Sequence, residues 1–264
     1  MNHLETILQH KRQEVAARRR ECTPEQLREM PMFTRRTLSL RERLSGKRMG
    51  VVAEIKKASP SKGVIREQFD PAAIARSYVS GGAAAVSVLT ETRFFQGSLS
   101  ILASVRTLVD VPLLRKDFIL DPYQLVEAKG YGADAVLLIA AALDPAHLRE
   151  LQDEARALGL ECLVEVHTEA ELMTLDQSKC DLIGINNRDL ATFTTDLSVS
   201  LKLRPLIRRE TVVVSESGIS TADDLRTLMN GDIHAVLIGE AFMRQADPGS
   251  ALAALLSSVG EVTP

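Results

Sequence analysis

The chain has 264 residues, which fits one large domain or two small ones, and its hydrophobic fraction of 45% is ample for a core. Its net charge is −3, with acidic and basic residues mixed along the chain, so composition gives no case for binding nucleic acid or a membrane surface. Three widely spaced cysteines fit neither a metal site nor a disulfide framework. No signal-peptide core is visible, and no segment approaches ~18 uninterrupted apolar residues. We therefore expect a protein of the reducing cytoplasm that does not span a membrane.

Residues 1–48 differ from the rest of the chain and predict a helical N-terminal extension. Apolar residues with partly helical spacing alternate with Glu, Arg and Gln. Thr23 and Pro24 are typical of a helix start, and Gln26 can complete a capping box with Thr23. The extension could lie across one end of the main domain or mediate self-association.

Residues 49–264 repeat a unit of apolar strand, polar loop and amphipathic helix about every 25 to 30 residues. We expect strands at 51–56, 84–89, 112–116, 134–139, 161–166, 182–186, 211–216 and 235–239. We expect helices near 71–80, 98–108, 121–129, 144–157, 168–175, 197–208, 220–229 and 249–258. Eight alternating units favour a closed (β/α)₈ barrel, a TIM barrel, over an open doubly wound sheet. A G-x-G-x-x-G motif is absent after the first strand, which further weakens a dinucleotide-binding alternative.

The first expected strand ends with an acid and an amine on one face. Glu54 and Lys56 are two residues apart, so in a strand they project side by side. A structural ion pair on an edge strand is one interpretation. The other is that the strand delivers catalytic groups to a shared pocket, because barrel active sites lie at the C-terminal ends of the strands.

The other strand ends also carry polar residues. They are Lys116 at the end of the third strand, Glu165 at the end of the fifth, Asn186 at the end of the sixth with Arg188 in the loop after it, Glu216 at the end of the seventh followed by Ser217 and Gly218, and Gly239 at the end of the eighth followed by Glu240. Two lysines and three glutamates would converge on one mouth, where mutual proximity shifts pKa values toward acid–base work.

The seventh and eighth loops, at Ser217–Gly218 and Gly239–Glu240, are candidates for a phosphate site. Glycines let backbone N–H groups approach an anion, although they also serve as simple turn residues. We expect Glu240 to use its backbone N–H, with its carboxylate turned away. His167 could reach the pocket, but no cysteine or serine constellation accompanies it, and the sequence has no H-E-x-x-H or clustered Asp pattern for a metal.

Seven ordered motifs give the chain a close resemblance to the indole-3-glycerol phosphate synthase family of tryptophan biosynthesis. They are AEIKKASPSKG (53–63), SVLTETRFFQGS (87–98), LLRKDFI (113–119), LVEVH (163–167), IGINNRDL (183–190), VSESGIS (214–220) and LIGEAFM (237–243). The resemblance implies closure of the indole ring of 1-(2-carboxyphenylamino)-1-deoxyribulose 5-phosphate, with loss of CO₂ and water. It also implies that neither a metal nor an organic cofactor takes part.

The resemblance also implies roles for individual residues. Lys116 resembles the general acid and Glu165 the general base. Glu54 and Asn186 resemble residues that hold the sugar hydroxyls and position the lysines. Lys56 resembles the lysine near the substrate carboxylate and is a second candidate proton donor. Which lysine serves ring closure and which serves dehydration stays open.

The remaining implied residues form two groups around a phosphorylated small-molecule substrate. Those around the phosphate are Ser59, Ser217, Gly218, Gly239 and Glu240. Those lining an apolar slot for the aromatic ring are Phe95, Phe118, Leu137, Leu190 and Leu237. Arg188 matches an arginine beside the site, and Glu216 is placed among the substrate-binding residues. We expect a monomer or weak homo-oligomer.

Two other functions are open to a barrel with these residues. A sugar-phosphate isomerase could manage with one acid and one base, but the second lysine and the ring-sized apolar slot argue against it. A catalytically inactive barrel kept as an interaction partner would have no reason to hold so many repelling charges together.

Overall fold

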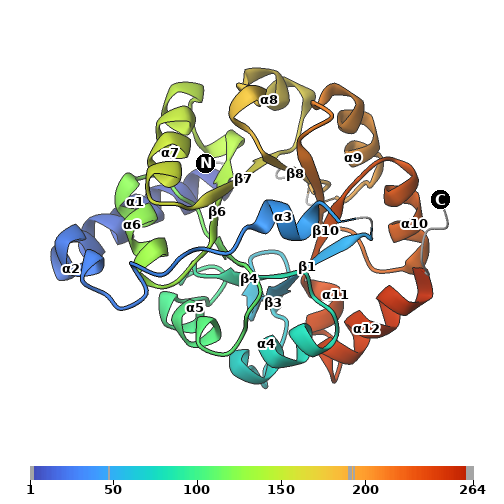
Figure 1. Cartoon of the computed structure of the whole chain (residues 1–264), viewed down its shortest axis with the longest axis horizontal. Helices are drawn as coiled ribbons and strands as arrows, with labels where there is room; N and C mark the ends of the chain where they lie inside the picture. Colours follow the sequence, from blue (N-terminus) through green and yellow to red (C-terminus); the bar gives the residue numbers. More distant parts are fainter. Residues whose placement is uncertain (1–2, 47, 190–191, 193, 260–264) are drawn as a thin grey trace.

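The computed structural model, which describes residues 3–46, 48–189, 192 and 194–259, is a closed ring of eight parallel strands surrounded by helices (Figure 1). The strands of the ring are β1 (Gly50–Ile55), β4 (Ala85–Leu89), β5 (Leu113–Lys116), β6 (Ala135–Ile139), β7 (Glu161–Val166), β8 (Leu182–Asn186), β9 (Val212–Glu216) and β10 (Ala235–Ile238). They pair in chain order, and β10 closes the ring against β1. The predicted TIM barrel is therefore confirmed.

The outer helices alternate with the strands as predicted, except that the structure adds the short helix α11, which the sequence did not predict. They are α4 (Pro71–Ser80), α5 (Leu99–Arg106), α6 (Pro122–Gly130), α7 (Pro145–Ala157), α8 (Glu169–Thr174), α9 (Ser198–Leu203), α10 (Ala222–Asn230), α11 (Glu240–Met243) and α12 (Pro248–Val259). The helix predicted at 197–208 is shorter in the structure, where α9 gives way to a 3₁₀ turn at Arg204–Leu206. Pro205 explains the break, because proline lacks the backbone N–H that would continue the α-helical hydrogen bonds.

The barrel holds two apolar layers. Inward-facing side chains such as Val52, Leu114 and Leu163 fill the interior of the ring. Outward-facing side chains such as Val86 and Val164 pack under the helices. Burial on both faces explains why the strands read as continuous apolar runs rather than as alternating ones.

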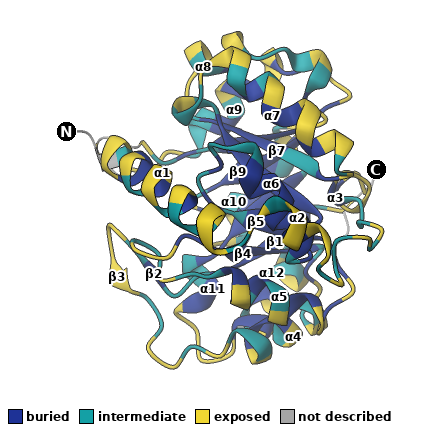
Figure 2. Cartoon of the chain, turned by 90° about the vertical axis from the view of Figure 1, so that its left-hand side faces the viewer, coloured by how far each residue is buried: buried dark blue, intermediate teal, exposed yellow. Residues whose placement is uncertain are grey.

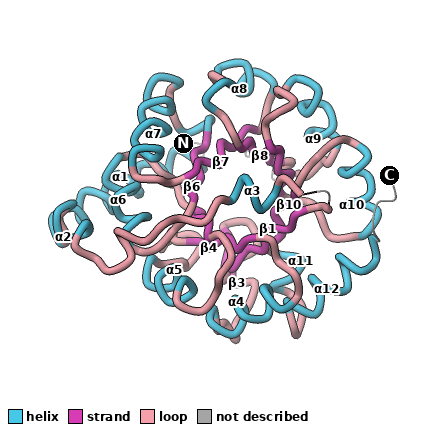
Figure 3. The backbone as a smooth tube through the Cα atoms, in the orientation of Figure 1, coloured by secondary structure: helices cyan, strands magenta, loops and turns pink. Residues whose placement is uncertain are grey.

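The N-terminal extension covers both ends of the barrel. Helix α1 (His3–Glu21) lies on one side in Figure 2, and the five-residue helix α3 (Leu40–Leu44) lies on the opposite side. Leu40 and Leu44 are fully buried within the interior cluster, so α3 closes the N-terminal end of the ring, where Figure 3 shows it inside the circle of strands. The sequence did not predict α3.

Two smaller features complete the fold. Helix α2 (Pro24–Arg28) begins at Thr23 with the predicted capping box to Gln26. The loop after β1 folds into a short antiparallel ladder of β2 (Ala58–Ser59) and β3 (Gly63–Val64). Among the described helices, none is long and apolar enough to cross a membrane.

Candidate active site

A cavity of about 510 Å³ lies at the C-terminal ends of the strands. Its lining includes every predicted site residue that the structure describes: Glu54, Lys56, Ser59, Phe95, Lys116, Phe118, Leu137, Glu165, Asn186, Arg188, Glu216, Ser217, Gly218, Leu237, Gly239 and Glu240. Leu190 lies outside the described residues. One concave site therefore collects residues from all eight units of the barrel, as its topology requires.

Lys116 forms the centre of the charged part of this cavity. Its Nζ lies 2.8 Å from Glu165 Oε2 and 3.0 Å from Glu216 Oε2. Burial disfavours the ammonium, but the two carboxylates outweigh burial and raise the pKa of Lys116 above the ordinary lysine range. Lys116 is therefore protonated and positively charged at neutral pH.

The two carboxylates beside Lys116 have opposite shifts. Burial favours the neutral form of Glu165, but Lys116 and then His167 outweigh it and lower the pKa of Glu165 to about 2. Burial raises the pKa of Glu216 to about 8, and the nearby charge of Glu165 adds to it. One ammonium thus holds one carboxylate ionised, and the second carboxyl keeps a proton to a higher pH.

Two glycines make room for the buried acids. A Cβ built on Gly184 of β8 would overlap Glu216 Oε1, and a Cβ built on Gly239 would overlap Glu54 Oε1. Each glycine lies at an inward-facing position beside its acid, so the carboxylate occupies the space that a side chain would fill. The sequence alone indicated no role for Gly184, because its neighbour Glu216 comes from a different strand.

Glu54 and Lys56 form the first-strand wall of the site. Lys56 Nζ lies 2.7 Å from Glu54 Oε1, and the Glu54 side chain is buried while Lys56 reaches the cavity. Tyr78 of α4 donates a hydrogen bond of 3.1 Å from its hydroxyl to the Glu54 carbonyl, which fixes the end of β1. The pair lies on a strand inside the ring and lines the cavity, unlike an ion pair on an edge strand.

The turn after β9 has an unusual backbone. Ser217 and Gly218 have φ angles of 67° and 78°, in the left-handed region that favours glycine. The buried side chain of Asn187 donates to the carbonyls of Glu216 at 2.9 Å and Ser217 at 3.1 Å, and so holds this turn in place. A non-glycine residue held in this region at a cavity edge is the kind of local strain found at binding sites.

The loop after β10 brings Glu240 to the edge of the cavity. Glu240 is the first residue of α11, and its Oε1 accepts hydrogen bonds from Arg244 at 2.8 and 3.0 Å. Its charge is therefore partly neutralised by Arg244, which also lines the cavity. Ser59 lies in the loop after β1. Its buried hydroxyl makes no hydrogen bond within the described part of the chain.

The apolar part of the cavity is built from aromatic and aliphatic side chains. The rings of Phe95 and Phe118 lie 6.3 Å apart, tilted by 44°, and Leu137 and Leu237 line the same space. The carboxylate of Glu91 accepts backbone hydrogen bonds from the loop that carries Phe95, including one of 3.0 Å from Phe95 itself. The slot is therefore held by a capped loop as well as by the strands.

Helix α1 contributes residues that the sequence analysis did not assign to the site. Leu4 and Ile7 line the cavity, so α1 forms part of its roof. Lys11 is fully buried, and its Nζ lies 2.8 Å from Asp117, the residue after Lys116. Partly helical spacing marked the apolar face of α1, but nothing in the sequence indicated that this face meets the mouth.

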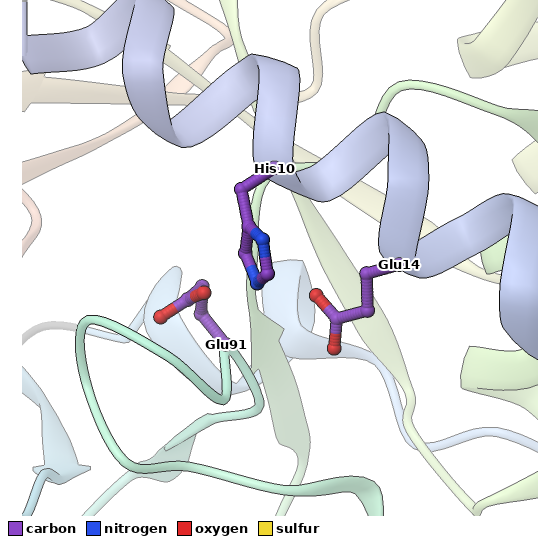
Figure 4. A group of neighbouring side chains, drawn as sticks. All are labelled: His10, Glu14 and Glu91. Atoms are coloured by element: carbon purple, nitrogen blue, oxygen red, sulfur yellow. The ribbon is translucent and has the colours of Figure 1, made fainter.

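One cluster of three potential metal ligands joins α1 to the loop after β4. Figure 4 shows His10, Glu14 and Glu91 facing one another, with their ligand atoms within 4.8 Å. The oxygens are already in use: backbone N–H groups bind Glu91, and Lys11 and Arg18 bind Glu14. Two further contacts join α1 to this loop: Thr92 Oγ1 donates a hydrogen bond of 3.1 Å to Glu14 Oε1, and Arg93 lies 3.5 Å from His10 Nδ1.

Comparison with known proteins agrees with this geometry. Residues 4–255 match the family model of indole-3-glycerol phosphate synthase. The indole-3-glycerol phosphate synthase of Carboxydothermus hydrogenoformans is 49% identical over 96% of this chain and 99% of the relative. That of Salinibacter ruber is 49% identical over 97% of this chain and 95% of the relative.

Solved structures show the same fold at low sequence identity. The 3-hexulose-6-phosphate synthase of Salmonella typhimurium has a TM-score of 0.64 at 14% identity, covering 80% of this chain and 98% of the other. The thiamine phosphate pyrophosphorylase of Pyrococcus furiosus has a TM-score of 0.60 at 19% identity, covering 84% of this chain and 98% of the other. With the family model matched almost end to end and close relatives covered over their whole length, the chain belongs to the indole-3-glycerol phosphate synthase family, whose members are carboxy-lyases of tryptophan biosynthesis.

Proposed function

We propose that this barrel converts 1-(2-carboxyphenylamino)-1-deoxyribulose 5-phosphate to indole-3-glycerol phosphate, CO₂ and water. The observation that carries the proposal is the position of Lys116, which is held between Glu165 and Glu216. On one side of it lies the apolar slot, and on the other lies a polar rim formed by the glycine-containing loops after β9 and β10. A flat anilino ring fits the slot, and the sugar phosphate extends toward the rim.

Ring closure needs a proton donor at the ketone of the substrate. The aromatic carbon that bears the carboxylate attacks the ketone carbon, and the carbonyl oxygen takes a proton as its negative charge develops. CO₂ then leaves and restores the aromatic ring. Lys116 is the general acid, and Lys56, paired with Glu54 near the substrate carboxylate, is the second donor.

Dehydration needs an acid and a base at the same time. The new hydroxyl leaves as water with a proton from an ammonium group, while Glu165 takes a proton from the neighbouring methylene carbon. Loss of the proton from Lys116 removes the charge that lowers the pKa of Glu165, so Glu165 becomes a stronger base when a base is needed. The ammonium groups donate two protons in each turnover, and Glu165 accepts one. Each turnover therefore consumes one proton, as loss of CO₂ from a carboxylate requires.

The remaining site residues bind and orient the substrate in this proposal. Glu54 and Asn186 hold sugar hydroxyls, and Arg188 lies beside them. The phosphate is bound by Ser59 and by backbone N–H groups, the latter in the two loops Ser217–Gly218 and Gly239–Glu240. The strained turn at Ser217 and the buried, unused hydroxyl of Ser59 support this location.

The direct test is an assay of the purified protein with the anilino-deoxyribulose phosphate in the absence of added metal. Appearance of indole absorbance and fluorescence is the expected result, and its absence rejects the proposal. A dephosphorylated substrate should bind much more weakly, because it lacks the group that the rim holds. Equal affinity for both substrates would exclude the two loops as the phosphate site.

We also propose that the enzyme acts in the cytoplasm as a monomer or weak homo-oligomer and binds no nucleic acid. Its three cysteines are free thiols, which suits a reducing compartment. The net charge of −3 favours no polyanionic partner. The large apolar side chains exposed in the described part of the chain, Val64, Leu108, Met173 and Leu206, belong to four separate segments of the sequence. Light scattering across a concentration series tests the oligomeric state.

A further inference from the structure

His167 lies directly behind the proposed base and does not line the cavity. It is the residue after β7, and its side chain is 6% exposed. Its Nε2 lies 3.5 Å from Glu165 Oε1, while the other oxygen of that carboxylate, Oε2, lies 2.8 Å from Lys116 Nζ. The carboxylate is therefore enclosed by two basic groups, one on the substrate side and one on the far side.

The other ring nitrogen of His167 also meets a carboxylate. Nδ1 lies 3.4 Å from Glu171 Oε2 of α8, and the same oxygen accepts a hydrogen bond of 2.7 Å from the backbone N–H of His167. Both ring nitrogens are buried from solvent and make no hydrogen bond within the described residues, so their contacts with the two carboxylates are ion-pair contacts. A neutral imidazole has one nitrogen that can only accept, whereas an ionised carboxylate offers only acceptors. The doubly protonated ring is the form that suits both contacts.

The charges around the ring favour the same form. The groups that act on it are Glu165 on its own strand, Glu171 on α8 and Glu216 on β9. Lys116 is the nearby ammonium that balances Glu165 and Glu216. Burial opposes protonation of His167, but the glutamates outweigh burial and raise its pKa above the ordinary histidine value.

We propose that His167, as an imidazolium held by Glu171, is a positioning residue that keeps Glu165 ionised and oriented for proton abstraction. The inference rests on the proposed function only in giving Glu165 the role of base. It adds a second cation whose charge persists after Lys116 has given up its proton. The sequence shows His167 two residues after Glu165, but not that its ring turns back toward that carboxylate.

A titration of the substrate-free enzyme tests the charge of His167 directly. Two-dimensional NMR of the histidine ring nitrogens follows each imidazole with pH, and loss of one signal set in His167→Asn assigns the residue. We expect His167 to be doubly protonated at pH 6.5. A neutral ring at that pH overturns the proposal, whatever the enzyme's activity.

Kinetics of two variants test the consequence for Glu165. In His167→Asn we expect kcat to fall roughly tenfold with KM changed by less than about threefold, because the base is misplaced while the substrate-binding groups remain. The acid limb of the pH–rate profile should move upward by about one pH unit, because Glu165 loses a neighbouring positive charge. Glu171→Gln should shift the limb in the same direction by less.

His147→Asn is the matched control. His147 lies in the first turn of α7 and contacts Glu150 and the carbonyl of Leu120, not Glu165 or Glu216. It should leave kcat and the acid limb unchanged.

Two results in His167→Asn would overturn the proposal. One is a wild-type kcat with an unmoved acid limb, and the other is a loss of activity with an unmoved acid limb. If His167→Asn does not fold, an unmoved limb in Glu171→Gln overturns it. A wild-type enzyme that forms no indole rejects the proposed function while the NMR result still decides the charge.

Discussion

The two ends of the barrel use the same eight strands for opposite purposes. At the N-terminal end, Leu40 and Leu44 of α3 are fully buried on an apolar interior. At the C-terminal end, Glu54, Glu165 and Glu216 are buried among charges. Removing apolar surface from water stabilises a fold, whereas burying charges costs free energy unless they are closely paired. One end of the ring therefore stabilises the fold, and the other uses part of that stability to hold reactive groups.

Loss of the proposed acid, Lys116, or of the proposed base, Glu165, should have the largest effect on activity. We expect Lys116→Ala and Glu165→Gln each to lower kcat by about two or more orders of magnitude, the usual effect of removing a general acid or base. The fold should persist, because the N-terminal end of the barrel is untouched. Steady-state kinetics and circular dichroism measure the two outcomes.

Lys179→Ala is the control for these two variants. Lys179 pairs with Asp153 on the protein surface, 2.7 Å away, and lies outside the cavity lining. Its turnover should equal that of the wild type. Near-normal turnover in Lys116→Ala or Glu165→Gln would overturn the role of that residue.

A substitution at the N-terminal end of the barrel should lower the stability of the fold without lowering kcat. Leu44→Ala removes a fully buried side chain of α3, the helix that plugs the N-terminal end of the ring. We expect the free energy of unfolding to fall by about 2 to 5 kcal/mol, as for other large-to-small changes in a core. Denaturant titration measures the change, and kcat at 25 °C should stay within a factor of about two, because α3 touches no catalytic group.

Leu206→Ala supplies the comparison for this variant. Leu206 is 39% exposed, so its truncation should change stability by less than about 0.5 kcal/mol. If Leu44→Ala were equally mild, α3 would not be a plug. A large fall in kcat at full folding would show that the two ends are coupled rather than separate.

Gly184, which lies beside Glu216, gives a further test of the difference between the two ends of the barrel. Gly184→Ala places a methyl group where Glu216 Oε1 lies, so the carboxyl must move away from Lys116. We expect kcat to fall roughly tenfold to a hundredfold, the scale on which small misplacements reduce catalysis. Gly46→Ala, near the opposite end of the barrel, has no neighbour within 4 Å and should leave kcat unchanged.

Most of the barrel could be predicted because its signals are local. Each strand has an unbroken apolar run, and aspartate followed by proline marks the starts of α4, α6 and α7. The strand-end residues followed from the topology alone, since parallel strands bring their C-terminal ends to one face. Ser217 is an example: its position after β9 was enough to place it at the mouth.

The unpredicted features depend on partners that are distant in sequence. Helix α3 has only five residues, too few for a periodic pattern, and its role as a plug depends on the ring that it closes. Lys11 resembles any lysine on a polar helix until Asp117 is seen beside it. Gly184 gains its meaning only from Glu216 on the next strand.

The smallest effect we predict is a difference in how stability depends on pH. The folded protein raises the pKa of Glu216 to about 8, so between the ordinary glutamate value and pH 8 the folded state binds a proton that the unfolded state does not. Its contribution to stability is therefore full below that ordinary value and is lost as pH rises toward 8. Glu165, with its pKa lowered to about 2, contributes in the opposite direction, and only as pH falls below the ordinary range.

Glu216→Gln should therefore flatten the pH dependence of unfolding between pH 5 and 8. The slope that it removes cannot exceed about 1.4 kcal/mol per pH unit, the value for one proton. Denaturant titrations at several pH values measure the slope, and Leu44→Ala should lower every point equally, because no titrating group is lost at the N-terminal end. If Leu44→Ala changed the slope as much as Glu216→Gln, the titrating charge would not be confined to the catalytic end. Parallel curves for wild type and Glu216→Gln would mean that Glu216 is ionised throughout, and that Lys116 holds two charged carboxylates rather than one.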